Sequence, residues 1–449
     1  MFENAFRQRG YEDMKVAVAG TGYVGLVTGV CLAENGHEVT CVDVDEKKIK
    51  TMQEGKAPIY EPGLQELMTK NADRLRFTTD HEAAYRDAEV IFIGVGTPEK
   101  KDGSANLSFV FAVADQIAES VRNECVVVVK STVPIGTNDR VEASINEKAK
   151  GRVKIHVASN PEFLAQGTAV RDTLHASRIV IGVEDDFSKD KLLSLYKGVD
   201  APVVVTNRRS AEMIKYASND FLALKISYIN EIANLCEAIG ADIKDVAKGM
   251  SYDSRIGDKF LNAGIGYGGS CFPKDTKALS WLATFNDHEI KTVKAAIEVN
   301  ENQKLLPIKK ARRYFNDLRG VNVAVLGLTF KPGTDDLREA PSLVTVPVLI
   351  DDGAVIRAWD PVGVENFKKQ VPEGVEYCDS IEDTLKDADV CFIFTEWPEV
   401  LGLDPSVFVS LMKNPVVIDG RNCFDTSMIA SVKGIVYDSI GRAVIDTRS

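Results

Sequence analysis

A glycine-rich turn near the start of the chain constrains the fold more than any other feature of the sequence. Residues 15–20 (KVAVAG) form a short β-branched run that enters the turn Gly20-Thr-Gly-Tyr-Val-Gly25, after which come a helical pattern and a second strand at 38–43. Glycines in such a turn let backbone N–H groups approach a pyrophosphate at the positive end of the helix. Asp43 closes the second strand, where the ribose-binding acid of a dinucleotide site is expected. The pattern predicts a Rossmann-type domain that prefers NAD to NADP.

Strand candidates and helical segments alternate through the rest of the first half of the chain. Short apolar runs at residues 89–95, 125–130 and 154–158 are separated by helical patterns. This alternation is typical of a right-handed parallel α/β sheet. We therefore expect an N-terminal NAD-binding Rossmann domain over residues 1–206, in which residues 1–13 form an extension with no assigned role.

A long segment without glycine or proline follows this domain. Between residues 210 and 239 apolar side chains recur at helical spacing, and Gly240 is placed to end the helix. At ~1.5 Å per residue, such a helix is long for one domain and suits a bridge between two domains or a contact with a second subunit. A second helical stretch is expected over residues 290–315. Residues 207–303 thus form a predicted central helical domain that carries a cysteine loop.

The C-terminal third repeats the strand pattern of the first domain. NVAVLG at 322–327 resembles KVAVAG, AVIRAWD at 354–360 resembles HEVTCVD, and DADVCFIF at 387–394 resembles DAEVIFIG. The second copy lacks G-x-G-x-x-G, so residues 304–449 are expected to bind something other than a dinucleotide. The predicted fold class is α/β, with two Rossmann-like doubly wound parallel-sheet domains joined by a long central helix and a helical domain.

Composition excludes several other classes of protein. The net charge is −12, and no stretch combines Lys and Arg with aromatic residues, which argues against nucleic acid as a partner. No apolar run is long enough to span a membrane, and the N-terminal residues lack the apolar core of a signal peptide. The eight cysteines are scattered without a C-x-x-C pair, so neither a metal site nor a disulfide framework is expected. We expect a cytoplasmic protein.

One cysteine lies in an unusual loop. In GIGYGGSCFPKD, residues 264–275, four glycines precede Cys271, Lys274 and Asp275. Each glycine costs roughly 0.5–1 kcal/mol in an ordered element, so a loop of this kind usually lets the backbone wrap closely around a ligand. The positive charge of Lys274 favours the thiolate form of Cys271. An isolated cysteine is usually inert packing, but this loop favours a reactive one.

Other polar residues follow helical or strand patterns. Lys215 and Asn219 lie four residues apart and share one face of the long helix, so they could jointly hold an oxyanion; periodicity alone favours an exposed polar pair. Thr132 and Glu162 follow predicted strands, at the carboxyl ends where open α/β sheets bind ligands. Glu162 is a candidate general base, with simple loop capping as the alternative. Lys48 could face the ribose or be a solvated helix lysine.

Together these motifs resemble the UDP-glucose/GDP-mannose dehydrogenase family, and the match covers nearly the whole chain. Independent motifs occur in the expected order in all three parts. They are Gly20-Thr-Gly-Tyr-Val-Gly25, Tyr60-Glu-Pro-Gly63, Gly94-Val-Gly-Thr-Pro98, Lys130-Ser-Thr-Val-Pro134, Asn160-Pro-Glu-Phe-Leu164, Gly266-Tyr-Gly-Gly-Ser-Cys-Phe-Pro-Lys-Asp275 and Phe330-Lys-Pro-Gly-Thr-Asp-Asp336.

The resemblance implies a four-electron oxidation that uses two NAD⁺ and converts the C6 alcohol of a nucleotide sugar first to an aldehyde and then to a carboxylate. Cys271 would form a thiohemiacetal with the aldehyde, and loss of a second hydride would leave a thioester for water to hydrolyse. By similarity, Lys215 and Asn219 stabilise the oxyanion. The residues that would position and activate water are Asp275, Thr132 and Glu162.

The resemblance also implies binding residues for the cofactor and the substrate, and no metal. The cofactor residues are Gly20, Gly22, Tyr23, Val24, Gly25, Asp43, Lys48, Thr97, Ser131, Thr132, Glu162, Lys274 and Arg338. The substrate residues are Glu162, Phe163, Leu164, Lys215, Asn219, Arg255, Phe260, Gly268, Cys271, Phe330, Lys331 and Arg421.

Segments 94–107 and 270–276 most resemble family members that oxidise UDP-glucose to UDP-glucuronate. The second sheet would then hold the UDP group, with charge from Lys331 and Arg421. Arg255 matches a family position that reaches the substrate of a neighbouring subunit, which implies a homodimer built on the long helix. The same chemistry on a UDP-N-acetylhexosamine or GDP-mannose is an alternative.

One departure and two rival functions bear on this interpretation. Many relatives have a second acid where this chain has Gln166, which leaves the hydrolytic base open between Glu162 and Asp275. A two-electron hydroxyacid-type dehydrogenase also combines a Rossmann domain with a helical domain, but it does not explain Cys271 or the second sheet. A protein that binds nucleotide sugars without turnover would not need Cys271, Lys215 and Glu162 together.

Overall fold

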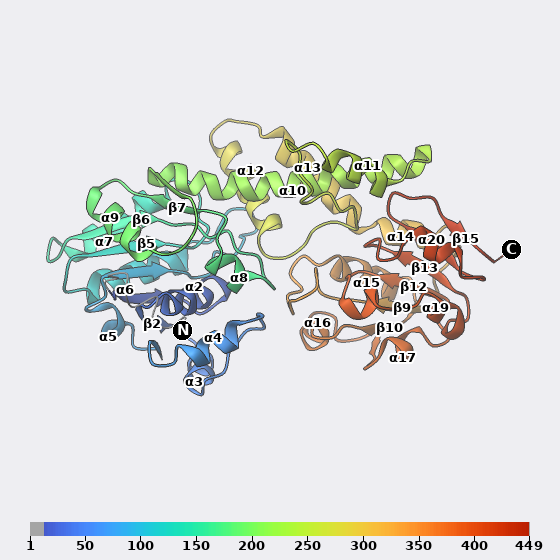
Figure 1. Cartoon of the computed structure of the whole chain (residues 1–449), viewed down its shortest axis with the longest axis horizontal. Coiled ribbons are helices and arrows are strands. Elements are labelled where there is room, and N and C mark those ends of the chain that lie inside the picture. The colour runs from blue at the N-terminus through green and yellow to red at the C-terminus, as the bar shows by residue number, and fades with distance from the viewer. Residues whose placement is uncertain (1–12, 449) are drawn as a thin grey trace. The chain divides into compact units, whose positions relative to one another are not determined.

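The computed structural model describes residues 13–448, so the predicted N-terminal extension lies almost wholly outside the described residues. The chain forms two compact units that divide between Ser218 and Asn219. Each unit contains one sheet, and in Figure 1 the strands of the first run from blue to green and those of the second from orange to red. The predicted α/β class with two Rossmann-like sheets is confirmed.

The sheet of the first unit has the strand order β3-β2-β1-β4-β5-β6-β7-β8 and is parallel except between β6 and β7. Its strands are β1 (Lys15–Ala19), β2 (Glu38–Val42), β3 (Leu75–Thr78), β4 (Val90–Ile93), β5 (Cys125–Val129), β6 (Ile155–Ser159), β7 (Ile179–Gly182) and β8 (Val203–Thr206). Its helices are α2 (Tyr23–Glu34), α3 (Glu46–Gln53), α4 (Leu64–Lys70), α5 (His81–Tyr85), α6 (Ser108–Ser120), α7 (Thr137–Ala149), α8 (Ala169–Leu174) and α9 (Asp186–Leu195).

Both faces of this sheet are buried. Successive side chains of a strand point to opposite faces, and in β1 Val16 and Val18 join one apolar cluster while Ala17 and Ala19 join another. Strands buried on both faces read as continuous apolar runs, as in CVVVV of β5. This burial is the physical basis of the doubly wound arrangement that the sequence predicted.

The second sheet repeats the order of the first six strands, with β11-β10-β9-β12-β13-β14 followed by an antiparallel β15. Its strands are β9 (Asn322–Leu326), β10 (Val355–Trp359), β11 (Val375–Tyr377), β12 (Val390–Ile393), β13 (Val416–Asp419), β14 (Val436–Ser439) and β15 (Ile445–Asp446). Helices α15 (Pro341–Asp351), α16 (Val364–Gln370), α17 (Ile381–Leu385), α18 (Pro398–Leu401), α19 (Ser406–Leu411) and α20 (Thr426–Ala430) belong to the same part of the chain. The internal repeat seen in the sequence is therefore a repeat of topology.

The predicted long helix is α10 (Arg208–Ile239), and Gly240, with φ of +77°, follows its last residue. Within the second unit its residues Ile229, Ala233 and Cys236 pack into the same apolar cluster as the second sheet. Three further helices complete the helical segment: α11 (Ile243–Ser251), α12 (Phe272–Phe285) and α13 (Lys291–Lys304). Across residues 13–448 no helix, α10 included, is both long and apolar enough to cross a membrane.

The helical stretch expected over residues 290–315 is present, but it is divided into two helices. The structure has α13, which ends at Lys304, and a separate short helix α14 (Leu306–Ala311). Pro307 stands at the start of α14, where its missing N–H costs nothing, whereas inside one continuous helix it would remove a hydrogen bond. Apolar periodicity continues across the break and hides it.

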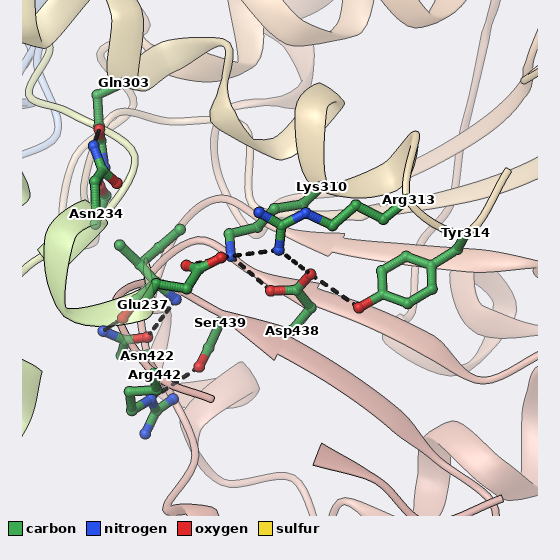
Figure 2. Close-up of polar contacts among 12 residues, drawn as sticks. Asn234, Glu237, Gln303, Lys310, Arg313, Tyr314, Asn422, Asp438, Ser439 and Arg442 are labelled. Atoms are coloured by element: carbon green, nitrogen blue, oxygen red, sulfur yellow. Dashed lines mark hydrogen bonds and ion pairs between the residues drawn. The ribbon is translucent and has the colours of Figure 1, made fainter. Parts of the chain in front are cut away.

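A buried polar network holds α10 and α14 against the second sheet. Lys310 is fully buried, and its Nζ donates to Glu237 Oε2 of α10 at 2.7 Å and to Asp438 Oδ1 of β14 at 2.6 Å (Figure 2). Arg313 Nη1 donates to Glu237 Oε1 at 2.9 Å and Tyr314 Oη to Asp438 Oδ2 at 3.0 Å. Every oxygen of the two carboxylates thus has a partner, which is the condition for burying charge without a large penalty.

Candidate active site

The glycine turn of the first unit leaves an open approach to the start of α2. Gly20 has φ of +92°, and a Cβ at Gly25 would lie 2.0 Å from the carbonyl oxygen of Gly20, so both positions require glycine. A Cβ at Gly22 would meet nothing within 4 Å, and the residue is exposed. Tyr23 and Val24, at the start of the helix, are half-buried. Backbone N–H groups there can be reached by an anion such as a pyrophosphate.

Asp43 lies beside this turn at the end of β2. Its Oδ2 accepts from Thr21 N at 2.8 Å and Thr21 Oγ1 at 2.6 Å. Partial burial opposes ionisation, but hydrogen bonds from Thr21 and Asp45, with the charge of Lys48, keep the pKa of Asp43 below its usual value. An ionised, half-exposed carboxylate at this point fits the ribose hydroxyls of NAD. The turn and the acid together fit the predicted dinucleotide.

Two further predicted cofactor residues bind the loops after β4 and β5 to each other. Thr97 Oγ1 donates to the carbonyl oxygen of Thr132 at 2.9 Å, and Ser131 Oγ donates to that of Val95 at 2.6 Å. The carboxyl ends of neighbouring parallel strands share one edge of the sheet, next to the glycine turn, where open α/β sheets bind ligands. The structure therefore brings Thr97, Ser131 and Thr132 to one edge.

Glu162 and Lys215 form a buried ion pair. Lys215 Nζ lies 2.8 Å from Glu162 Oε1, and the side chains are 3% and 5% exposed respectively. The other carboxylate oxygen accepts from the backbone N–H of Leu164 at 2.7 Å, and the ring of Phe163 lies 5.5 Å from Lys215 Nζ. Glu162 therefore accepts a hydrogen bond from the loop backbone and also pairs with the positive charge of Lys215. The alternative of an exposed Lys215 is wrong.

Sequence reasoning missed Lys130, which lies close to this pair. Its Nζ donates to Asn160 Oδ1 at 2.9 Å. Burial lowers the pKa of Lys130 to about 8, with the charge of Glu162 opposing the fall and that of Lys215 adding to it. The motif Lys130-Ser-Thr-Val-Pro134 contains Lys130, but only the structure shows that this lysine is buried and that neighbouring charges change its pKa.

In the second unit, Asp275 is the centre of a polar group at the start of α12. Cys271 immediately precedes this helix, and Asp275 is 1% exposed. Asp275 Oδ2 accepts from Asn219 Nδ2 at 2.7 Å, and its Oδ1 accepts from Lys274 Nζ at 2.6 Å. Asn219 is also buried, so an exposed polar face is wrong for it too. The first turn of α12 after Cys271 therefore carries a lysine and a carboxylate, and the amide of Asn219 on α10 binds that carboxylate.

Cys271 differs from the other cysteines in its surroundings. Its side chain is exposed, whereas burial raises the pKa of Cys31, Cys41 and Cys125 to about 12 and makes those thiols poor nucleophiles. Cys271 lies at a helix N-terminus, whose partial positive charge favours a thiolate. Exposure and the helix end make it the cysteine best suited to react.

The glycine-rich loop before Cys271 is held by the segment that follows β9. Gly269 N donates to the carbonyl oxygen of Arg338 at 2.7 Å. A Cβ at Gly268 would lie 2.5 Å from the carbonyl oxygen of Glu339, and one at Gly269 would lie 2.8 Å from the ring of Phe330. These glycines are needed because the two segments approach so closely. The structure thus brings the predicted residues Gly268, Phe330 and Arg338 together.

Other predicted substrate residues are placed around the same loop. Phe260, with φ of +64°, has its ring 6.1 Å from that of Phe272. Arg421 donates to the carbonyl oxygens of Phe394, Gly266 and Phe330 at 2.8, 3.3 and 3.2 Å. Through these hydrogen bonds Arg421 stabilises the loop and places a positive charge beside it.

Three further predicted cations have neighbours within the second unit. Lys331 Nζ lies 5.6 Å from the ring of Phe330 and is half-buried. The side chain of Arg255 is 87% exposed and binds Asp253. Arg338 binds Asp336 in the same way, at 2.6 Å.

Comparison with known proteins agrees with this arrangement. Three models of the UDP-glucose/GDP-mannose dehydrogenase family match in order: the NAD binding domain at residues 14–200, the central domain at 209–302 and the UDP binding domain at 324–426. A UDP-glucose 6-dehydrogenase of Bacillus subtilis is 50% identical over 434 residues, which cover 96% of this chain and 98% of that protein. The chain belongs to this family. The predicted use of NAD is confirmed by the first match.

Further relatives extend the likeness within the family. A UDP-glucose 6-dehydrogenase of Rhizobium meliloti is 46% identical, covering 96% of this chain and 100% of that one. The structure of a UDP-glucose dehydrogenase from Pyrobaculum islandicum is 38% identical, with a TM-score of 0.91 and coverage of 97% and 99%. A UDP-D-ManNAc dehydrogenase structure from Pyrococcus horikoshii is more distant, at 26% identity and a TM-score of 0.85, covering 96% and 99%. As a family dehydrogenase the chain is an NAD-dependent oxidoreductase, as its sequence predicted.

Proposed function

We propose that this family member oxidises UDP-glucose at C6 to UDP-glucuronate, in two successive oxidations with a covalent intermediate on Cys271. The observation that carries the proposal is the exposed Cys271 at the start of α12, followed on the first turn by Lys274 and Asp275, which bind each other, while Asn219 of α10 donates to Asp275. A simple alcohol oxidation needs a base and correct geometry but no nucleophile. NAD⁺, when bound, supplies the hydride acceptor for each oxidation.

The residues of the chain have distinct parts in this reaction. The Cys271 thiol adds to the carbonyl carbon of the aldehyde and gives a thiohemiacetal. Loss of a hydride from that carbon and of a proton from its hydroxyl leaves a thioester. Water then displaces Sγ and releases the carboxylate, so the thiol is restored.

Charged and amide groups would stabilise the oxygen that becomes negative in these steps. By similarity we assign this role to the ammonium of Lys215 and the amide of Asn219. One such donor in a site shielded from water is typically worth ~2.7–4 kcal/mol of barrier. Asp275, Thr132 and Glu162 are assigned to position and activate water. Glu162 binds Lys215 and Asp275 binds Lys274, so each carboxylate is held in place by a lysine.

UDP-glucose is proposed as the sugar because relatives that share 46–50% of their residues with this chain carry that name. Family structures named for N-acetylated sugars share 25–26%. The predicted residues for the UDP group and sugar are those around the Cys271 loop and the second sheet: Phe260, Gly268, Phe330, Lys331 and Arg421. NAD and nucleotide sugars are cytoplasmic metabolites, which supports the predicted cytoplasmic location.

A homodimer is part of this proposal. Within the second unit, α10 carries Phe221, Tyr228 and Leu235 at seven-residue spacing, and these are 61%, 49% and 54% exposed. A row of large apolar side chains exposed on one helix is typical of a subunit interface. Light scattering of the purified protein should give twice the chain mass of 49.1 kDa; the mass of one chain would contradict the dimer.

The experiment that tests the function is a count of NADH formed per sugar. Limiting UDP-glucose is added to the wild type and to the Cys271→Ser variant, and UDP-galactose, UDP-N-acetylglucosamine and GDP-mannose are tested in parallel. We expect two NADH per UDP-glucose for the wild type, and a variant that stops before the second equivalent.

Other outcomes separate the rival functions. One NADH per sugar would support a two-electron dehydrogenase. A Cys271→Ser variant that yields two NADH like the wild type would contradict the covalent intermediate on Cys271. Binding of the sugar without NADH would support a protein without turnover. Preference for another sugar would keep the chemistry and change the substrate.

A further inference from the structure

Asp220 is a buried carboxyl group to which the reaction proposed above gives no role. It follows Asn219 on α10 and is 3% exposed. Neither of its carboxyl oxygens has a hydrogen-bond partner among the described residues. Asp275 and Asp438, which are also buried, accept hydrogen bonds at both oxygens. A buried carboxylate without partners costs several kcal/mol, so Asp220 is in a different state from these two.

The titratable groups that face Asp220 belong to the Cys271 loop and to α12. Burial raises the pKa of Asp220 to about 8, and the charge of Asp275 adds to the rise while that of Lys274 opposes it. Its charge also acts on Tyr267 of the glycine-rich loop. Near pH 7 Asp220 is therefore a neutral acid. Asp275 and Lys274 then form a balanced ion pair at the end of the helix where Cys271 lies.

We propose that Asp220 is a positioning residue of the Cys271 site, which acts by staying protonated. As a neutral acid it adds no charge to the pair of Lys274 and Asp275. When it ionises, a second negative charge near Asp275 disfavours the thiolate of Cys271 and the oxyanion formed on the substrate. The catalytic part of this inference rests on the proposed function; the effect on Cys271 does not.

The reactivity of Cys271 tests the inference without turnover. The alkylation rate of Cys271 with iodoacetamide is measured against pH by mass spectrometry of its peptide, in the wild type, Asp220→Asn and Asp258→Asn. Asp220→Asn keeps the shape of the acid but cannot ionise, so its profile should move to lower pH by about half a unit or more. Asp258 is exposed in the same unit, and its variant should match the wild type. Coinciding profiles for Asp220→Asn and wild type, or equal shifts in both variants, would overturn the inference.

Thermal stability gives a second readout. An aspartate with a pKa of about 8 when folded and about 3.9 when unfolded binds more protons in the folded state. Between about pH 4 and about pH 8 this carboxyl group is ionised in the unfolded state but protonated in the folded state, so the stability of the wild type falls as the pH rises through this range. Asp220→Asn should melt at a higher temperature than the wild type at pH 8, and the difference should shrink toward pH 4. A difference that is absent, or constant with pH, would overturn the neutral state.

Turnover separates this inference from the proposed function. The kcat of the wild type should fall at alkaline pH more steeply than that of Asp220→Asn, with KM for the sugar little changed. If Asp220→Asn does not fold, Asp220→Ala supplies the same uncharged comparison. Failure of the proposed function appears as full NADH yield in Cys271→Ser. Failure of this inference appears as unshifted profiles in a protein whose turnover still requires Cys271.

Discussion

The two sheets have the same strand order, and an aspartate follows the second strand of each, but the two aspartates have different surroundings. Asp43, after β2, is half-buried and accepts hydrogen bonds from Thr21 and Asp45. Asp360, after β10, is 5% exposed and is enclosed by donors of its own chain. These donors are the N–H groups of Leu328, Thr329, Val362 and Gly363, the Thr329 hydroxyl and the indole of Trp397.

The turn after the first strand differs in the same way. Gly22 of the first sheet corresponds to Thr329 of the second, two residues after Gly20 and Gly327 respectively. Among the described residues, no atom lies within 4 Å of a Cβ at Gly22, which is exposed, whereas Thr329 is 1% exposed. Thr395 Oγ1 donates to the carbonyl oxygen of Thr329. The aspartate after the second strand is therefore open to a ligand in the first sheet, whereas in the second sheet it stabilises the fold.

The largest effect that would test this comparison is expected for Asp360→Ala. The change leaves several buried N–H groups without an acceptor, so we expect a loss of about 3–5 kcal/mol in the free energy of unfolding. Urea unfolding followed by circular dichroism measures it. Tryptophan fluorescence assigns the loss to the second unit, because Trp281, Trp359 and Trp397 all lie there. Asp43→Ala is the matched control and should cost about 1 kcal/mol or less; equal losses would contradict the comparison.

A smaller effect is expected when the first sheet receives the residue of the second. Gly22→Thr places a side chain where we expect the pyrophosphate of NAD to approach, and should weaken NAD binding by about 100-fold, or ~2.7 kcal/mol. The fold should be unaffected, because Gly22 has φ of −77° and an added Cβ meets no atom. Isothermal titration calorimetry measures the affinity. Binding of NAD within a few-fold of wild type would show that the open turn is not the phosphate site.

The smallest effect is expected for Asp43→Asn. The amide can still accept one hydrogen bond from Thr21 but loses the charge that we expect to bind the ribose and to repel a 2′-phosphate. We expect about tenfold weaker use of NAD and reduced discrimination against NADP, measured as the ratio of their kcat/KM values. Glu46→Gln, an exposed acid at the start of α3, is the control for a general change of charge. An unchanged ratio would remove Asp43 from cofactor selection.

Most of the fold could be predicted because its signals are local. The run KVAVAG, the turn at Gly20–Gly25 and the long glycine-free helix each follow from short-range backbone preferences. Strands β3, β7 and β8 of the first sheet and β11, β13, β14 and β15 of the second were not predicted, and the valines of β8 are exposed at the edge of their sheet. The break before α14 escaped because apolar periodicity continues through it. Edge strands and breaks depend on what packs against them, which local patterns do not contain.

The candidate site could be predicted only in part. The glycines before Cys271 indicated a functional loop, and the structure shows that neighbouring segments lie too close to Gly268 and Gly269 for a side chain. Lys215 and Asn219 were expected to act as one pair, yet each binds a different carboxylate, Glu162 and Asp275 respectively. These contacts join residues 53 and 56 positions apart. Asp220 gave no signal, because a polar residue next to Asn219 reads as part of a solvated face.

The sequence by itself determined the two Rossmann-like sheets, the long helix, the dinucleotide turn and the cysteine loop, since glycine, β-branched and helical patterns act over a few residues. Tertiary structure decided the state of each charged group. Within the part of the chain that the structure describes, Asp43 remains open and Asp360 is enclosed, and Asp275 has hydrogen-bond partners whereas Asp220 has none, although all four are aspartates in ordinary local sequence. The physical reason is that burial and hydrogen-bond partners set the energy of a charge, and both come from residues far away in the chain.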